Sequence, residues 1–150
     1  GDLVGDYGRH HRSINVAAKK WPLGTTISYF FSASYTDEQK ANIRAAFALW
    51  TASSCLTFQE NAPATPGVPS ISIPVSLDDG CEFTPTAAHE IGHALGLEHT
   101  QSRADRDSYV RINVANIDAE FSSNFVKMDS ADNNNYGIKY DYGSVMHYDA

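Results

Sequence analysis

Alternating apolar and polar residues predict two β-strands in this chain. In the run TTISYFF, Ile27, Tyr29 and Phe31 occupy every second position and share one face. Residues 70–77 alternate in the same way, but Pro74 interrupts them. Because proline has no N–H to donate to a neighbouring strand, we expect this second segment to lie at the edge of a sheet. Such an edge can pair with an extended peptide, or the proline can simply protect it against aggregation.

A helix is predicted between these strands, because apolar residues recur there at helical spacing. It begins at Thr36, where the sequence TDEQ has the form of a capping box that satisfies free backbone N–H groups. Its apolar face holds Ile43, Ala46, Phe47 and Trp50. Packing in the core explains this face, and a short strand around Leu56 and Phe58 is expected to follow.

A second helix is predicted to begin at Thr84, which can serve as its N-cap, with Pro85 as the first helical residue. Gly96 can adopt a positive φ angle and end this helix. Between these bounds, His89 and His93 are four residues apart, so both imidazoles lie on one helix face and can reach a single metal ion.

A chain that turns back at Gly96 can bring His99 to the same ion. Three histidines leave one position of a tetrahedral zinc ion open, as in catalytic zinc sites. Glu90 can face that position and deprotonate a zinc-bound water molecule, which is the chemistry of amide hydrolysis. The complete pattern HExxHxxGxxH is much more specific than HExxH alone. The alternative is a set of surface histidines with no metal.

Composition and charge exclude several classes of function. The chain has 150 residues, which fits one domain, and a net charge of -7. Nucleic acid is not an expected partner, because phosphate binding requires clustered lysines and arginines. No apolar run is long enough to span a membrane. Cys55 and Cys81 permit one disulfide, two free thiols, or pairing with cysteines outside this chain.

HEIGHALGLEH, residues 89–99, resembles the zinc-binding motif of the metzincin peptidases, and further segments make the chain similar to the astacin family. These segments are Trp21-Pro22, Cys55 after the first helix, RADRDSYVRINVANI from Arg103, and SVMHY from Ser144. The resemblance spans Trp21 to Tyr148. It implies an α+β fold of the zincin-like, astacin type. The N-terminal subdomain would have a twisted sheet and two long helices, and the C-terminal subdomain would be mostly missing.

The resemblance also implies a secreted endopeptidase with one catalytic Zn²⁺ ion, which hydrolyses peptide bonds in proteins. Its zinc ligands would be His89, His93 and His99, with Glu90 as general base and acid. Tyr148 would bind zinc in the resting enzyme and then support the oxyanion, although it could instead be a packed aromatic residue. Met146 would pack under the site in a methionine-containing turn. The charged residues Arg103, Asp105, Arg106 and Asp107 are expected to form a buried ion-pair network.

In astacin proenzymes a short motif blocks the zinc ion, and Gly1-Asp2-Leu3 resembles its end. Residues 1–12 are therefore expected to be a propeptide remnant that an activating protease removes after Arg12, with residues 13–150 forming an incomplete peptidase domain. Asp2 would be the blocking ligand, or else an ordinary acidic residue in a flexible arm. The edge strand, including Ser72, Ile73 and Val75, would align a peptide substrate.

The chain departs from the astacin pattern in three ways, and two of them, the shortened middle and the missing C-terminal half, support a competing hypothesis. Thr100 replaces the glutamate that usually follows the third histidine and engages the freed N-terminus. The connection from Cys55 to the zinc helix is also short, and one astacin strand and one cysteine are missing from it. The competing hypothesis is a zinc-binding, catalytically incompetent protein that binds peptides without cleaving them.

Overall fold

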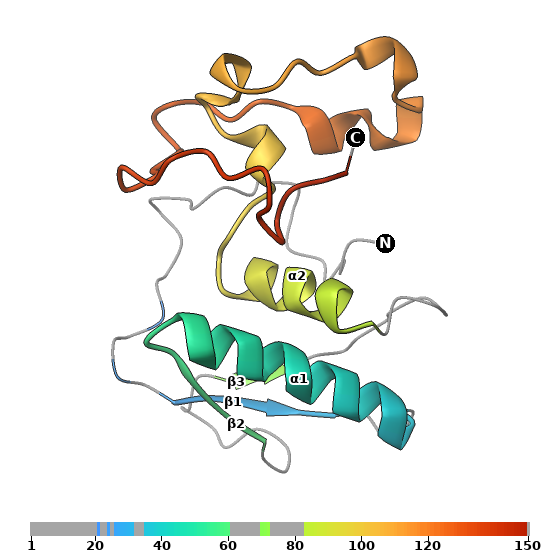
Figure 1. Cartoon of the computed structure of the whole chain (residues 1–150), viewed down its shortest axis with the longest axis vertical. Coiled ribbons are helices and arrows are strands. Elements are labelled where there is room, and N and C mark those ends of the chain that lie inside the picture. Colours follow the sequence, from blue (N-terminus) through green and yellow to red (C-terminus); the bar gives the residue numbers. More distant parts are fainter. Residues whose placement is uncertain are drawn as a thin grey trace. The chain divides into compact units, whose positions relative to one another are not determined.

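The computed structural model describes residues 21, 24, 26–31, 35–60, 70–72 and 83–149. These residues form two compact units, one ending at Leu95 and the other beginning at Gly96. The first unit contains a sheet and two α-helices, whereas the second consists of short 3-10 helices and loops (Figure 1). None of the described helices has both the length and the apolar character needed to cross a membrane.

The sheet of the first unit has three described strands in the order β2-β1-β3. Their bounds are β1, Thr26–Phe30, β2, Thr57–Glu60, and β3, Ser70–Ser72. Both neighbours pair with β1 in parallel. The predicted alternation in β1 is confirmed, because Ile27 and Tyr29 are buried. β3 lies at one edge of the described sheet, as expected, while residues 73–77 lie outside the described part of the chain.

Helix α1, Asp37–Ser53, packs against this sheet through its predicted apolar face. Its N-terminus has the expected capping box: the Thr36 hydroxyl accepts a hydrogen bond from the Gln39 N–H at 3.2 Å, and the Gln39 side chain accepts one from the Thr36 N–H at 2.7 Å. The Phe47 ring stacks on the Tyr29 ring of β1 with centroids 3.9 Å apart. This contact joins the helix to the central strand.

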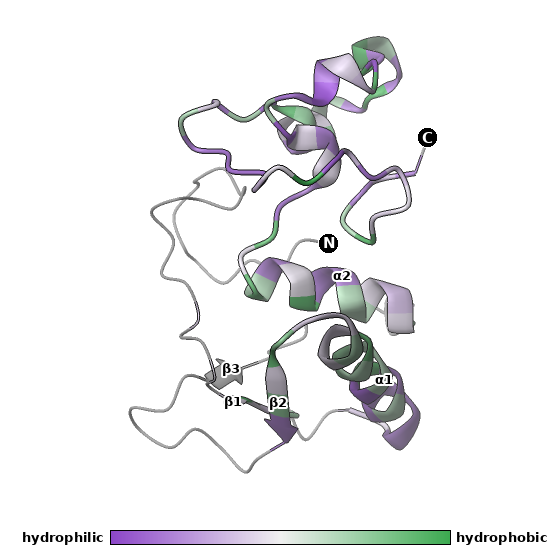
Figure 2. Cartoon of the chain, turned by 60° about the vertical axis from the view of Figure 1, so that its left-hand side comes forward, coloured by the Kyte–Doolittle hydropathy of each residue, from purple (hydrophilic) through white to green (hydrophobic). Residues whose placement is uncertain are grey.

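Helix α2, Thr84–Ala94, packs against α1 (Figure 1). The indole N–H of Trp50 donates to the carbonyl of Ala88 at 2.9 Å, which fixes the two helices against each other. The prediction that Thr84 is the N-cap was wrong by one residue, because Phe83 occupies that position. The Thr84 hydroxyl instead donates to the Asn42 carbonyl of α1 at 3.4 Å, so it contacts the neighbouring helix rather than its own. Both helices carry hydrophobic and hydrophilic residues (Figure 2).

The second unit is held together by hydrogen bonds among its loops and short helices. Its 3-10 helices are Thr100–Ser102, Arg106–Ser108, Val114–Asn116 and Ala119–Phe125. The Arg103 guanidinium donates to both oxygens of Asp105 at 2.9 Å and also to the carbonyl of Ile138 at 3.1 Å. This arginine therefore joins two segments that are distant in the sequence.

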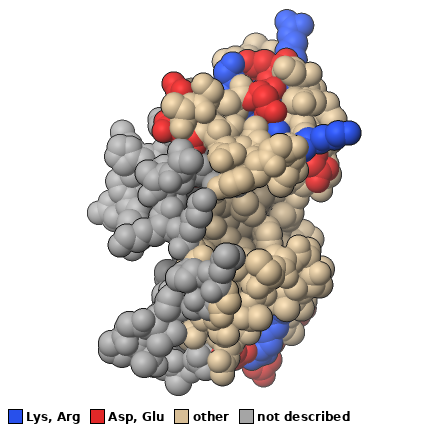
Figure 3. All heavy atoms as spheres, turned by 90° about the vertical axis from the view of Figure 1, so that its left-hand side faces the viewer, with Lys and Arg blue, Asp and Glu red and all other residues tan. Residues whose placement is uncertain are grey.

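The expected buried network of Arg103, Asp105, Arg106 and Asp107 is instead two separate ion-paired groups with exposed carboxylates. Asp105 pairs with Arg103, whereas Asp107 pairs with Arg106 and Lys127. The side chains of Asp105 and Asp107 are 39% and 59% exposed. Hydration of these carboxylates avoids the cost of burying a charge. On the face shown in Figure 3, acidic and basic side chains likewise lie beside one another at the surface.

Candidate metal centre

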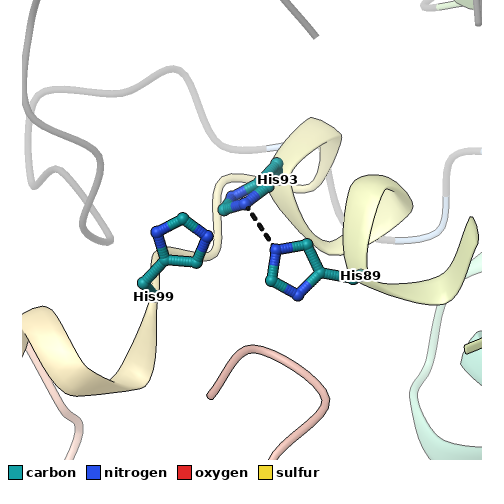
Figure 4. A group of neighbouring side chains, drawn as sticks. All are labelled: His89, His93 and His99. Carbon is teal, nitrogen blue, oxygen red and sulfur yellow. Dashed lines mark hydrogen bonds between the residues drawn. The ribbon is translucent and has the colours of Figure 1, made fainter. Parts of the chain in front are cut away.

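Helix α2 places two of the predicted zinc ligands side by side. His89 and His93 lie one turn apart, and their Nε2 atoms are 3.1 Å from each other (Figure 4). Their rings meet edge to face with centroids 4.7 Å apart. Both side chains are partly buried. The helical spacing therefore produces the paired imidazoles that the sequence predicts.

Gly96 turns the chain away from α2 toward the third histidine. Its φ angle is +91°, as the sequence predicts for the residue that ends this helix. A few residues later, His99 directs its ring toward the other two (Figure 4). One nitrogen from each of the three rings lies within 4.8 Å of the others.

These distances fit a single zinc ion. Tetrahedral zinc with Zn–N bonds of about 2.0–2.1 Å requires ligand nitrogens about 3.3 Å apart. The His89–His93 separation of 3.1 Å is close to this value, and a His99 nitrogen lies within 4.8 Å of a nitrogen of each of the other two rings. Nitrogen ligands and a tetrahedral geometry are typical of zinc sites. The three histidines are thus suited to hold this ion.

Glu90 follows His89 on α2, and its side chain is only partly exposed. Its Oε2 atom is shielded from solvent. His99, at 9% exposure, is buried as well. The arrangement therefore differs from the alternative of surface histidines, in which the rings and the carboxylate would face open solvent.

A buried polar turn, residues 99–102, follows the helix and forms hydrogen bonds with distant segments. The Thr100 N–H donates to the Met146 carbonyl at 2.8 Å. The Gln101 side chain, 1% exposed, accepts a hydrogen bond from the Tyr148 N–H at 3.1 Å. The Ser102 hydroxyl donates to the Asn124 carbonyl at 3.1 Å. The polar turn therefore joins the third histidine to the residues around Met146 and Tyr148.

Tyr148 lies against the third histidine. The centroids of the Tyr148 and His99 rings are 4.4 Å apart. The Tyr148 hydroxyl accepts a hydrogen bond from the side-chain amide of Asn124 at 3.3 Å. Met146 is 3% exposed, and its carbonyl accepts the bond from Thr100, so the methionine packs beside the chain that carries His99.

Sequence reasoning identified the histidines but missed Gln101, Ser102 and Asn124. The polar run TQS directly after the zinc motif was the available signal for the first two, because three consecutive polar residues need hydrogen-bond partners if they are buried. Asn124 gives no comparable signal, since its partner Tyr148 is 24 residues away in the chain.

Tyr140 is buried, and its hydroxyl is hydrogen-bonded to a neighbouring histidine. Its hydroxyl lies 2.8 Å from His147 Nε2, and its ring stacks on that of Tyr109. Burial raises the pKa of the Tyr140 phenol, and the nearby Arg103 guanidinium opposes this shift. Tyr140 therefore supports the methionine-containing turn as a neutral group at physiological pH.

Several predicted residues lie outside the described part of the chain. They are Asp2 and the rest of residues 1–12, Ile73, Val75 and Cys81. Of Ser72 the structure describes only the backbone, as the last residue of β3. Cys55 is exposed, and it forms no disulfide with any residue of the described ranges.

Comparisons with known proteins agree with this geometry. The profile of the astacin peptidase family matches residues 13–72 and 67–150. The chain is 38% identical to zinc metalloproteinase nas-32 of Caenorhabditis elegans, covering 93% of this chain and 23% of the relative. The chain is 36% identical to zinc metalloproteinase dpy-31 of the same organism, and that alignment covers 87% of this chain and 25% of the relative. The chain thus spans about a quarter of the length of these curated relatives.

Solved structures support the same assignment. High choriolytic enzyme 1, a hatching enzyme zinc-protease from the medaka fish Oryzias latipes, superimposes with a TM-score of 0.69 and 32% identity. The match covers 87% of this chain and 72% of that one. Myroilysin, with a TM-score of 0.58 and 19% identity, shares the fold. With its three histidines arranged for one zinc ion and its α+β fold, this chain belongs to the astacin family of zinc metallopeptidases.

Proposed function

We propose that the protein is a zinc-dependent endopeptidase that hydrolyses peptide bonds in proteins. The observation that carries this proposal is the convergence of nitrogens from His89, His93 and His99 within 4.8 Å, in the segment that also holds Glu90. The relatives named above are zinc metalloproteinases, which supports the same activity.

The zinc ion would polarise the substrate carbonyl and would lower the pKa of a water molecule to about 7. Glu90 takes a proton from the attacking water and later transfers it to the leaving amine nitrogen, so that the C–N bond breaks and a carboxylate and an amine are released. Tyr148 donates a hydrogen bond from its hydroxyl to the oxyanion that forms during attack.

Strand β3 is our candidate for aligning the substrate. It pairs with β1 on one side, and among the described strands none pairs with its other side. An extended peptide could add to such an edge by backbone hydrogen bonds. Ser72, Ile73 and Val75 would then be the residues beside the substrate. Secretion, blocking of the zinc by Asp2 and removal of residues 1–12 by an activating protease stay predictions from the astacin resemblance.

The decisive experiment compares the zinc-loaded parent with Glu90→Gln in the cleavage of a mixed peptide library. We expect both proteins to retain one zinc ion by metal analysis. The rate should fall at least about 10²-fold in the variant, the scale expected for loss of a general base. Glu38→Gln is a matched control, because it removes the same charge from an exposed position of α1. This control should cleave as fast as the parent.

Two other outcomes would count against the proposal. Equal cleavage by the parent and Glu90→Gln would remove this carboxylate from the mechanism. A parent that holds zinc and binds peptides but does not cleave them would instead support the competing hypothesis of a catalytically incompetent protein.

A further inference from the structure

We propose that Asn124 is a positioning residue for catalysis, which holds the Tyr148 hydroxyl so that its proton is directed toward the reacting peptide. This inference rests on the role of Tyr148 in the proposed function. It assigns a task to a residue that lies outside the zinc-binding segment and that gives no signal in the sequence.

The direction of the hydrogen bond supports this role. The Asn124 Nδ2 group donates to the Tyr148 oxygen at 3.3 Å in a partly buried environment. An amide NH₂ group can only donate, so the phenolic oxygen acts as the acceptor in this bond. The hydroxyl proton is therefore directed away from Asn124. A hydroxyl that must donate to an oxyanion requires this orientation.

The rest of Tyr148 is held independently of this contact. Its backbone N–H donates to the Gln101 side chain at 3.1 Å, and its carbonyl lies 2.6 Å from His147 Nδ1. Because a carbonyl can only accept, Nδ1 carries the proton in this bond. The ring packs between His99 and Phe125, with centroid distances of 4.4 and 5.6 Å. Loss of the Asn124 amide should therefore change the hydroxyl more than the backbone.

Asn124 is itself tied to the polar turn that follows the third histidine. The backbone carbonyl of Asn124 accepts the hydrogen bond from the Ser102 hydroxyl at 3.1 Å. Ser102 is 8% exposed, and its own carbonyl accepts from the Met128 N–H at 2.9 Å. The amide that orients Tyr148 is thus fixed relative to His99, which is the geometry that a positioning residue needs.

A double-mutant cycle on the zinc-loaded protein tests the proposal. Asn124→Ala should lower kcat about 3- to 10-fold, the effect of one neutral hydrogen bond, and change KM less than about twofold. In the Tyr148→Phe background, the same substitution should cause no further loss of kcat. Asn116→Ala, at an exposed position of the same unit, is the matched control and should leave kcat unchanged.

Asn124→Asp provides a second variant that preserves the shape of the side chain. The carboxylate can only accept, so it would reverse the hydrogen bond and capture the phenolic proton. We expect kcat to fall at least as much as in Asn124→Ala. A kcat equal to that of the parent in Asn124→Asp would overturn the positioning role even if Asn124→Ala did not fold.

A measurement that does not depend on activity follows the bond directly. The side-chain amide proton of Asn124, observed by NMR, should move upfield in Tyr148→Phe because its acceptor is removed. Tyr142→Phe is the matched control, since the Tyr142 hydroxyl donates to the Tyr109 carbonyl instead. An amide resonance that stays unchanged in Tyr148→Phe would contradict the proposal.

Failure of the proposed function and failure of the positioning role give different results in these variants. Parental kcat in Tyr148→Phe would remove this tyrosine from the proposed mechanism, and the positioning role would fail with it. If Tyr148→Phe lowers kcat but Asn124→Ala lowers it equally in both backgrounds, only the positioning role is wrong. Asn124 would then act on the fold and not through the hydroxyl.

Discussion

Substitution of Gly96 by alanine tests whether the turn after α2 sets the metal site. Gly96 has a φ angle of +91°, and a Cβ atom placed there would meet no other atom within 4 Å. The cost of the substitution therefore comes from the backbone conformation and not from a steric clash with neighbouring side chains. Backbone strain and unfolded-state entropy are then the two contributions that set its magnitude.

An alanine in a left-handed conformation costs about 1–2 kcal/mol relative to a right-handed one. The lower entropy of the unfolded alanine chain offsets about 0.4–1 kcal/mol of this cost. The free energy of unfolding should thus fall by at most about 1.6 kcal/mol, and each kcal/mol corresponds to about 2–4 °C in Tm for a chain of this size. Where the turn of the metal-free protein relaxes to relieve part of this strain, His99 moves, and zinc binding must restore the strained turn. A cost of about 1–2 kcal/mol on binding corresponds to an affinity about 5- to 30-fold weaker.

The assay combines thermal unfolding of the metal-free protein with competitive zinc titration against a chromophoric chelator. Gly137→Ala is the matched control. Gly137 also has a positive φ angle, +72°, and a Cβ atom added there would meet no atom within 4 Å. Gly137, however, lies far from the zinc motif in the sequence. Gly137→Ala should lose stability at unchanged zinc affinity, whereas Gly96→Ala should lose zinc affinity. Unchanged affinity in Gly96→Ala, or an equal loss in both variants, would refute the reasoning.

Two further predictions concern stability. Phe47→Ala should lower the free energy of unfolding by about 3–5 kcal/mol in chemical denaturation, because Phe47 is 3% exposed and stacks on Tyr29; a loss below ~1 kcal/mol would contradict its place in the core. The hydrogen bond from Arg103 lowers the pKa of the Asp105 carboxyl in the folded protein. The ionised carboxylate therefore stabilises the folded state above the ordinary carboxyl pKa of about 3.9, and this stabilisation is lost as the pH falls through the lowered pKa of the folded protein. Asp105→Asn should therefore weaken the decline in stability below about pH 4, measured by thermal unfolding as a function of pH. Because Asp105 is 39% exposed, water screens the pair, and its substitution should cost only about 1 kcal/mol at neutral pH.

The local elements could be predicted from the sequence where short-range chemistry determines them. The capping box at Thr36 needs only residues of the same turn, and the positive φ angle at Gly96 needs only the absence of a side chain. The start of α2 was misplaced because Thr84 has a competing partner, the Asn42 carbonyl, 42 residues earlier in the chain. A hydroxyl can cap its own helix or bond to a neighbour, and only the tertiary structure decides between them.

The same distinction explains what could be predicted of the metal centre. His89, His93 and His99 lie within eleven residues, so helical spacing and one glycine turn are sufficient to bring them together. The hydrogen bonds that join the polar turn to Asn124 and Tyr148 span 22 and 47 residues. No periodicity in the sequence records such contacts, although the resemblance to astacins did point to Tyr148 itself.

Thr100 shows how a departure from the family pattern can be consistent with the structure. This residue directly follows His99 and is 8% exposed, and it is the backbone N–H of Thr100 that donates to the Met146 carbonyl. A glutamate at this buried position would bring in a charge that requires a partner such as a freed N-terminus. A neutral threonine needs no charged partner. The hydrogen bond to the methionine-containing turn comes from the backbone N–H, so a threonine or a glutamate at position 100 could form it equally. The metal centre can therefore be organised here without the charge pair that the glutamate would need.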